Sequence, residues 1–365
     1  MTEKPRPNES IKKIDPYVGG DVTPLGFKRE ICLASNENLI GPSPKVKQAM
    51  LDAFEDISLY PSSRALQVRE AIAAQHNLQA KNIICGNGSE ELLLLLAKCY
   101  TAPGDEVLFF QYSFLVYRIA ALAAGATPVF VEQPNLEMDV DRLLAKVTDK
   151  TKIVYIDNPS NPVGGYMPFE DVKKLHANIP SSTILVLDGA YLDYMCDVED
   201  FDAGFKLVEE NENVMVTTTF SKAYALAGLR AGWGYAPDGI IDYLNRTRPP
   251  FNVNKVAQAA MIAAVQDQDW LRKSCDETNK QREAFINELK DISLDPQPAS
   301  SNFVLVRFPV GNGHDAHHAY RFMGENGVIL RPVAGYGLPE YLRITIGQAE
   351  DMQRTTELLK QFMNT

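Results

Sequence analysis

The chain has 365 residues and a formal net charge of -11, with 45% hydrophobic and 23% charged residues. These values are typical of a soluble globular protein of about two domains. An acidic surface repels phosphate backbones, which argues against nucleic acid as a partner. Residues 1–8 are polar, unlike a signal peptide, and the apolar stretch at 119–131 is shorter than the roughly 18 residues of a membrane span. With five scattered cysteines, we expect a cytoplasmic protein with free thiols.

The middle of the chain alternates strand-like and helix-like patterns. Runs rich in Val, Ile, Leu and Phe predict strands at residues 82–85, 106–110, 127–131, 152–157, 183–188 and 214–220. Helical patterns lie between them at 89–100, 113–124, 139–147 and 168–177. Continuous apolar strands are buried on both faces, and their alternation with helices is typical of parallel sheets. We therefore predict an α/β fold, in which a large domain has a mostly parallel central sheet.

The pattern changes after Pro249 and Pro250. It predicts helices at residues 254–266, 269–290, 314–326 and 350–363, and strands at 302–308, 328–331 and 341–346. Such a mixture indicates a smaller α+β domain at the C-terminus. We divide the chain into an N-terminal arm that is partly in the small domain (1–43), a large domain (44–255) and a small C-terminal domain (256–365).

Residues 86–91, Gly-Asn-Gly-Ser-Glu-Glu, follow one predicted strand and open a helix. The glycines permit close backbone approach, and we expect Ser89 to cap the helix. The N–H groups of a first helical turn suit a phosphate. A dinucleotide fingerprint would need a third glycine where Glu91 stands. A plain capped turn is an equal alternative for this segment alone.

Polar residues follow two more of the predicted strands. Residues 158–164 form a turn that contains two prolines, two asparagines and a glycine, and Asp188 ends an apolar strand three residues before Tyr191. Open α/β sheets bind ligands at the carboxyl ends of their strands. Taken singly, the first segment is better read as a plain turn, and Asp188 is either a helix cap or a ligand group in the cleft.

Lys222 follows the last of these strands, in a loop of small and apolar residues, and Arg230 comes eight positions later. A single lysine is ordinarily a solvated surface group. The small neighbours instead indicate a confined site.

Together these segments meet the needs of pyridoxal phosphate. This cofactor needs a lysine to form an imine, an anion beside its pyridine nitrogen, hydrogen bonds to its phenolic oxygen, an aromatic ring to stack on it and a phosphate cup. An adjacent carboxylate favours the protonated ring by about 1–3 pKa units. The residues that we assign, in that order, are Lys222; Asp188; Asn161 with Tyr191; Tyr112; and Gly88, Ser89, Glu90, Thr219 and Arg230.

With these residues the chain resembles the fold type I pyridoxal-phosphate enzymes of the class I/II aminotransferase superfamily, and among them the histidinol-phosphate aminotransferases. The resemblance covers nearly the whole chain. Its segments are residues 15–17, 33–38, 41–44, 60–61, 86–91, 158–164, 187–191, 217–230, 250–254, 258–260, 331–332, 335–339 and 341–347. The Ser-Lys pair with the later Gly-Leu-Arg, combined with the asparagine-proline turn at 158–164, is specific for the superfamily. Asn36-Glu37-Asn38 and the 341–347 segment narrow the resemblance to the subfamily.

The resemblance implies an aminotransferase that interconverts L-histidinol phosphate and 2-oxoglutarate with imidazole acetol phosphate and L-glutamate, in histidine biosynthesis. It implies that Lys222 forms the cofactor imine and later moves a proton between the substrate Cα and C4′ of the cofactor. Asp188 would pair with the pyridine nitrogen, and Tyr191 would hold the phenolic oxygen. Tyr60 would reach the phosphate of the neighbouring subunit, which implies a homodimer with shared active sites. Arg343 would bind the acidic group of the amino donor or 2-oxo acid. The residues implied around the substrate tail are Tyr17, Asn36 and Arg331.

The chain departs from the family pattern at a few positions. Gly189 stands where an acidic residue is common, and Gly19, Leu39 and Val163 replace proline, proline and threonine. The last three touch the N-terminal arm and the substrate rim. They weaken the substrate prediction more than the cofactor prediction.

Other functions stay open on the sequence. An aromatic amino-acid aminotransferase would use the same lysine and Arg343, and a pyridoxal-phosphate decarboxylase of a phosphorylated threonine would need no 2-oxo acid. A nicotinamide dehydrogenase would instead bind its dinucleotide through the glycines at 86 and 88. A binding protein without activity would have a Lys222 that borohydride does not modify. The five histidines do not form a set of metal ligands.

Overall fold

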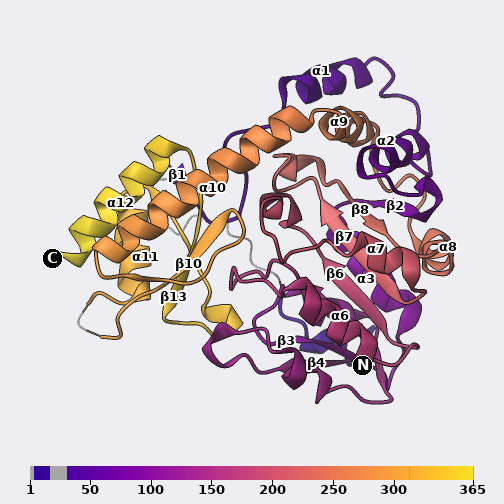
Figure 1. Cartoon of the computed structure of the whole chain (residues 1–365), viewed down its shortest axis with the longest axis horizontal. Helices are drawn as coiled ribbons and strands as arrows, with labels where there is room; N and C mark the ends of the chain where they lie inside the picture. The colour runs from indigo at the N-terminus through magenta and orange to yellow at the C-terminus, as the bar shows by residue number, and fades with distance from the viewer. Residues whose placement is uncertain (1–3, 17–30, 312, 365) are drawn as a thin grey trace.

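The computed structural model describes residues 4–16, 31–311 and 313–364, which form two lobes joined by one long helix (Figure 1). The larger lobe is built on a seven-stranded sheet in the order β2-β8-β7-β6-β5-β3-β4. Only β8 runs antiparallel to its neighbours, so the predicted mostly parallel sheet is confirmed. The strands are β2 (Ile83–Gly86), β3 (Glu106–Phe110), β4 (Thr127–Val131), β5 (Thr151–Asp157), β6 (Ile184–Asp188), β7 (Val214–Thr219) and β8 (Gly232–Tyr235).

Helices cover both faces of this sheet, because alternate residues of each buried strand point to opposite sides. One apolar core contains Ile153 and Val186, and the other contains Val154 and Leu185. The first face is covered by α3 (Ser89–Tyr100), α4 (Val116–Ala123) and α8 (Asp238–Thr247). The second is covered by α1 (Pro44–Ala53), α2 (Leu66–His76), α5 (Val140–Leu144), α6 (Phe169–Asn178), α7 (Phe205–Glu210) and α9 (Lys255–Val265).

The smaller lobe carries a four-stranded antiparallel sheet in the order β12-β13-β10-β9. A separate parallel pair joins β1 to β11, so that a segment from near the N-terminus belongs to this lobe. The elements are β1 (Ile31–Cys32), β9 (Asp295–Pro296), β10 (Phe303–Arg307), β11 (Val328–Ile329), β12 (Arg331–Pro332), β13 (Tyr341–Thr345), α10 (Gln268–Asp291), α11 (Ala316–Glu325) and α12 (Ala349–Met363). The single strand predicted at 328–331 is therefore two strands in two sheets, because β11 pairs with β1 and β12 pairs with β13.

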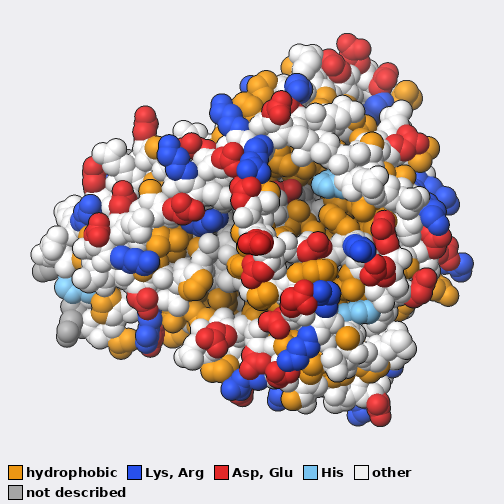
Figure 2. Space-filling view, in the orientation of Figure 1, with side chains coloured by type: hydrophobic (Ala, Val, Ile, Leu, Met, Phe, Trp, Pro, Cys, Tyr) orange, Lys and Arg blue, Asp and Glu red, His pale blue; other side chains and the backbone are white. Residues whose placement is uncertain are grey.

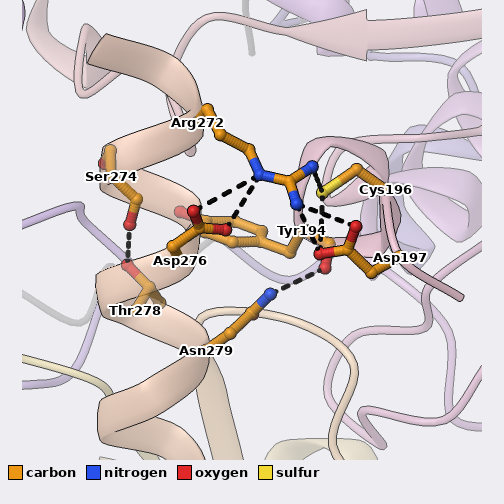
Figure 3. Close-up of polar contacts among 8 residues, drawn as sticks. All are labelled: Tyr194, Cys196, Asp197, Arg272, Ser274, Asp276, Thr278 and Asn279. Atoms are coloured by element: carbon orange, nitrogen blue, oxygen red, sulfur yellow. Dashed lines mark hydrogen bonds and ion pairs between the residues drawn. The ribbon is translucent and has the colours of Figure 1, made fainter. Parts of the chain in front are cut away.

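Helix α10 runs from the large lobe to the small one (Figure 1), and its side chains hold the segment that follows β6. Arg272 donates from Nη2 to both carboxylate oxygens of Asp197 at 2.8 and 2.9 Å and pairs with Asp276 on its own helix (Figure 3). Asn279 donates to the carbonyl oxygen of Tyr194 at 3.1 Å. These contacts hold the loop that follows β6 against α10, the helix that joins the lobes.

Acidic and basic side chains are interspersed over the face shown in Figure 2. No helix in the described part of the chain is both long and apolar enough to cross a membrane. Short 3-10 turns complete the structure, at Ile11–Lys13, Ala80–Asn82, Pro134–Leu136, Leu192–Met195, Ala227–Leu229 and Ala334–Tyr336.

Candidate active site

A cavity of about 130 Å³ lies where the carboxyl ends of β5, β6 and β7 meet the N-terminus of α3. Parallel strands end at one edge of their sheet, so segments far apart in the sequence meet there. Its lining contains these predicted site residues: Ser89, Glu90, Asn161, Asp188, Tyr191, Thr219, Lys222 and Arg230. The structure therefore brings together an amine, a carboxyl group, a phenol and an anion-binding helix end.

Lys222 extends from the loop after β7 toward the N-terminal segment of the small lobe. Its Nζ donates to the carbonyl oxygens of Ser35 and Asn36, both at 3.2 Å. Burial of the amine, followed by the positive charge of Arg343, lowers the pKa of Lys222 to about 7. A large fraction of this amine is therefore neutral near pH 7, which is the form that attacks a carbonyl group.

Asp188 ends β6 and is only 3% exposed. Its Oδ2 accepts a hydrogen bond from the hydroxyl of Tyr117 at 2.9 Å, and its Oδ1 accepts one from Thr217 at 3.1 Å. Burial raises the pKa of Asp188 to about 6, and these two hydrogen bonds oppose the rise. The carboxyl group thus has a fixed orientation and is mostly ionised at neutral pH.

A hydrogen-bonded network connects the two lobes across the cavity. Arg343 on β13 donates to Oδ1 of Asn161 at 2.6 Å and to the carbonyl oxygen of Ala34 at 2.7 Å. Asn36 donates to the hydroxyl of Tyr191 at 2.8 Å. Asn161 and Tyr191 line the cavity, so Asn36 and Arg343 lie directly behind its wall.

The N-terminus of α3 has no side-chain cap, because its N-cap residue is Gly88 and Ser89 is already helical. The prediction that Ser89 caps this helix was therefore wrong. A Cβ atom at Gly88 would lie 2.8 Å from Nη2 of Arg230, so glycine is what lets the guanidinium approach the helix end. Arg230 also donates to Oγ of Ser221 at 3.3 Å. Helix N–H groups, a hydroxyl and a guanidinium together suit a phosphate.

The other predicted residues lie outside the lining of this cavity. Tyr112 packs against an apolar cluster of the small lobe formed by Leu305, Val333 and Leu338. Arg331 is the cross-strand partner of Arg343 in the β12–β13 pair. Tyr60 is 81% exposed and stacks on Phe251, with ring centroids 4.5 Å apart. Tyr17 lies outside the described residues.

Some lining residues are ones that the sequence analysis did not assign: Phe114, Asp157, Pro159, Ala190 and Ser221. For two of these residues, the sequence contains a feature that could have predicted a place in the site. Asp157 ends an apolar strand as Asp188 does, and Ser221 directly precedes Lys222. No pattern in the sequence distinguished Phe114.

The residues present fit pyridoxal phosphate. The cavity offers an amine with a lowered pKa for the aldehyde and a buried carboxyl group for the pyridine nitrogen. Asn161 and Tyr191 can hold the phenolic oxygen, and the start of α3 with Arg230 can hold the phosphate.

Comparison with known proteins agrees with this geometry. Residues 28–359 match the family model for aminotransferase class I and II. The histidinol-phosphate aminotransferases of Rhodospirillum centenum and Paramagnetospirillum magneticum are 42% and 43% identical over 359 residues, which cover 98% of this chain and 99% of each relative. The crystal structure of histidinol-phosphate aminotransferase from Sinorhizobium meliloti in complex with pyridoxal-5'-phosphate is 27% identical, with a TM-score of 0.89 over 100% of this chain and 99% of that one.

The sequence match, the seven-stranded sheet and the cluster around Lys222 lead to one assignment. The chain belongs to the class I and II aminotransferases, and within them to the histidinol-phosphate aminotransferase family.

Proposed function

We propose that this protein is a pyridoxal-phosphate-dependent histidinol-phosphate aminotransferase of histidine biosynthesis. It interconverts L-histidinol phosphate and 2-oxoglutarate with imidazole acetol phosphate and L-glutamate. The observation that carries the proposal is the amine of Lys222, with a pKa of about 7, in one cavity with Asp188 and a phosphate-binding helix end. When bound, the cofactor supplies an electron sink for the carbanion at the substrate Cα.

The residues of this chain divide the work in the proposal. Lys222 would hold the cofactor through its amine and, as a neutral amine, would accept the proton from the substrate Cα. Asp188 keeps a negative charge at the pyridine nitrogen, held in place by Tyr117 and Thr217. Asn161 and Tyr191 would hold the phenolic oxygen, and Tyr112, from outside the cavity lining, would supply the aromatic ring. The phosphate is bound by Gly88, Ser89, Glu90, Thr219 and Arg230.

Two arginines support a substrate with strong negative charge. Arg331 and Arg343 are directly opposite in the antiparallel β12–β13 pair, and such partners share one face of a sheet. Guanidinium groups bind carboxylate and phosphate oxygens through paired hydrogen bonds, so two of them on one face suit an anionic substrate. A phosphate monoester and a dicarboxylate, which bind in turn, are both anions of this kind. Asn36 and Tyr17 complete the substrate-tail region in the proposal.

The aromatic amino-acid aminotransferase is the alternative on the same scaffold. Steady-state kinetics with 2-oxoglutarate and either L-histidinol phosphate or phenylalanine would separate the two. We expect kcat/KM to be at least about 10²-fold higher with histidinol phosphate, because phenylalanine leaves buried polar groups of the site without a partner. A preference for phenylalanine would overturn the proposed substrate but leave the aminotransferase assignment in place.

A homodimer is part of the proposal, supported by apolar side chains on the surface near Tyr60. Leu51, Phe54, Ile57 and Leu59 are each more than half exposed. Contiguous exposed apolar surface marks interaction sites. In a dimer this segment would carry Tyr60 to the partner's cofactor phosphate. We expect a Leu59→Asp variant to sediment as a monomer and to bind pyridoxal phosphate more weakly. A monomeric wild-type protein with full activity would contradict the dimer.

The proposed location is the cytoplasm. Both proposed co-substrates are small charged metabolites, which fits an enzyme that works there.

A further inference from the structure

A second buried carboxyl group lies beside Asp188. Asp157 is the last residue of β5, and its register partner on the parallel strand β6 is Asp188. Partners in register on neighbouring strands present their side chains to the same face of a sheet. Asp157 and Asp188 are 4% and 3% exposed, and both line the cavity. The floor of the site therefore holds two carboxyl groups side by side, of which the proposed cofactor chemistry uses one.

The two carboxyl groups have different hydrogen bonds. Both oxygens of Asp188 accept hydrogen bonds from hydroxyl groups. Asp157 accepts only at Oδ2, from the backbone N–H of Asn161 at 2.8 Å and from the hydroxyl of Ser160 at 3.3 Å. Its buried Oδ1 has no hydrogen-bond partner among the residues that the structure describes. A lone buried oxygen of this kind is costly as an anion but much less so when it carries a proton.

Asp157 is also connected, through Asn161, to Arg343, the arginine proposed to bind the substrate. The backbone of Asn161 donates to Asp157, and the side chain of the same Asn161 accepts from Arg343 at 2.6 Å. Displacing Asn161 would therefore move a contact of the proposed cofactor and a contact of the proposed substrate arginine together.

We propose that Asp157 is a positioning residue of this active site: as a neutral, protonated acid it holds the N–H of Asn161, and it leaves Asp188 as the only anion of the pair. This inference rests on the proposed function, because it assigns to Asn161 a contact with the cofactor.

The order of protonation agrees with this assignment. Burial raises the pKa of Asp157 to about 7, the N–H of Asn161 opposes the rise, and the charge of Asp188 adds to it. Burial also raises the pKa of Asp188, but two hydroxyl groups donate to its two oxygens and favour its ionised form, which makes it the more acidic of the pair. As pH falls through neutrality, Asp157 takes a proton first. The other charged groups that line the cavity are Glu90, Lys222 and Arg230.

The test compares Asp157→Asn with Asp157→Ala. Asparagine keeps an oxygen that can accept from Asn161 but cannot ionise, so Asp157→Asn should match the wild type in three measurements. These are the affinity of the apoenzyme for pyridoxal phosphate, the KM for glutamate, and the midpoint of the pH titration of the bound cofactor's absorbance. Asp157→Ala removes the acceptor, and we expect its cofactor affinity to fall and its glutamate KM to rise about tenfold each, the value of one buried hydrogen bond.

Two results would overturn the inference. One is an Asp157→Ala enzyme that equals the wild type. The other is an Asp157→Asn enzyme whose titration midpoint moves by about half a pH unit or more, as loss of an ionised neighbour would cause. Circular dichroism shows whether each variant folds. If Asp157→Ala does not fold, the midpoint of the absorbance titration of Asp157→Asn is the measurement that tests the inference.

The matched control is Asp193→Asn. Asp193 is another buried acid whose pKa burial raises to about 7, but it lines a different cavity. We expect the cofactor affinity and the titration midpoint of Asp193→Asn to equal those of the wild type.

Cofactor affinity and the half-reaction with glutamate do not depend on the other amino donor. A failure of histidinol phosphate as substrate would therefore leave this test intact, and a failure of Asp157 would leave the substrate proposal intact.

Discussion

The segment between residues 188 and 196 contributes to the lining of two cavities. Asp188 and Tyr191 line the candidate active site, of about 130 Å³. Asp193 and Cys196, a few residues later, line a larger cavity of about 390 Å³ against α10. The smaller cavity carries the proposed chemistry, so size alone does not identify the site.

The difference lies in how the charged groups are neutralised. In the larger cavity, Arg272 is paired with Asp197, and this contact raises the pKa of the arginine. In the smaller one, burial and nearby positive charge lower the pKa of Lys222 to about 7. Asp193 in the larger cavity also has a raised pKa, so a shifted pKa by itself is a weak marker of function. What distinguishes the smaller cavity is that an amine, a carboxyl group and an anion-binding helix end converge in it.

Replacing Lys222 should have the largest effect. We expect Lys222→Ala to lower turnover by at least about 10³-fold, because the site loses its proton-transfer group, and to abolish the absorbance band of lysine-bound cofactor. Lys174 is the control, since it is paired with Asp141 at the surface and its alanine variant should keep wild-type activity. Turnover and absorbance retained in Lys222→Ala would remove this lysine from the mechanism.

Arg343→Lys tests whether the second lobe completes the site. The guanidinium bonds Asn161 and Ala34 at once, and an ammonium cannot reproduce that planar geometry. We expect kcat/KM for 2-oxoglutarate to fall about 10²-fold, within the range for a lost charge-assisted contact, while Arg307→Lys, on the exposed end of β10, has little effect. Equal kinetics for Arg343→Lys and wild type would exclude a role in substrate binding.

The dependence of stability on pH should involve both cavities. The folded state holds protons on Asp157, Asp188 and Asp193 up to pH about 7, 6 and 7, whereas the unfolded state releases them near pH 4. The free energy of unfolding of the apoenzyme therefore loses these contributions as pH rises from about 4 to 7. Lys222 acts in the opposite sense above pH 7, because there only the unfolded state keeps its proton.

Urea denaturation at pH 5 and pH 7 measures this loss. Asp157→Asn and Asp193→Asn should each reduce the difference between the two pH values, although only the first residue lines the candidate site. An unchanged difference in both variants would show that these acids ionise normally in the folded protein.

Arg272→Ala in the larger cavity should have the smallest effect. The side chains of Arg272 and Asp197 are 51% and 65% exposed, and exposed ion pairs contribute about 0–1 kcal/mol. We expect a loss of that size in urea denaturation and unchanged kcat. A loss of activity comparable to that of Arg343→Lys would show that the tie between α10 and the loop after β6 shapes the active site (Figure 3).

The sequence alone determined the alternation of strands and helices, and it determined most candidate residues, because each lies at or just after the end of an apolar strand. It missed β8, whose four residues include two glycines and carry no clear strand pattern. It also placed Asp157 at the end of a strand without assigning it a role, although the same rule had selected Asp188.

Only the tertiary structure decided which of these residues meet. The bonds from Arg343 to Asn161 and from Lys222 to Asn36 join positions 182 and 186 residues apart. The register of β5 against β6 places Asp157 beside Asp188. Local sequence fixes what a segment prefers by itself, whereas contacts of this kind depend on how whole elements pack, because the backbone between them sets no preferred distance.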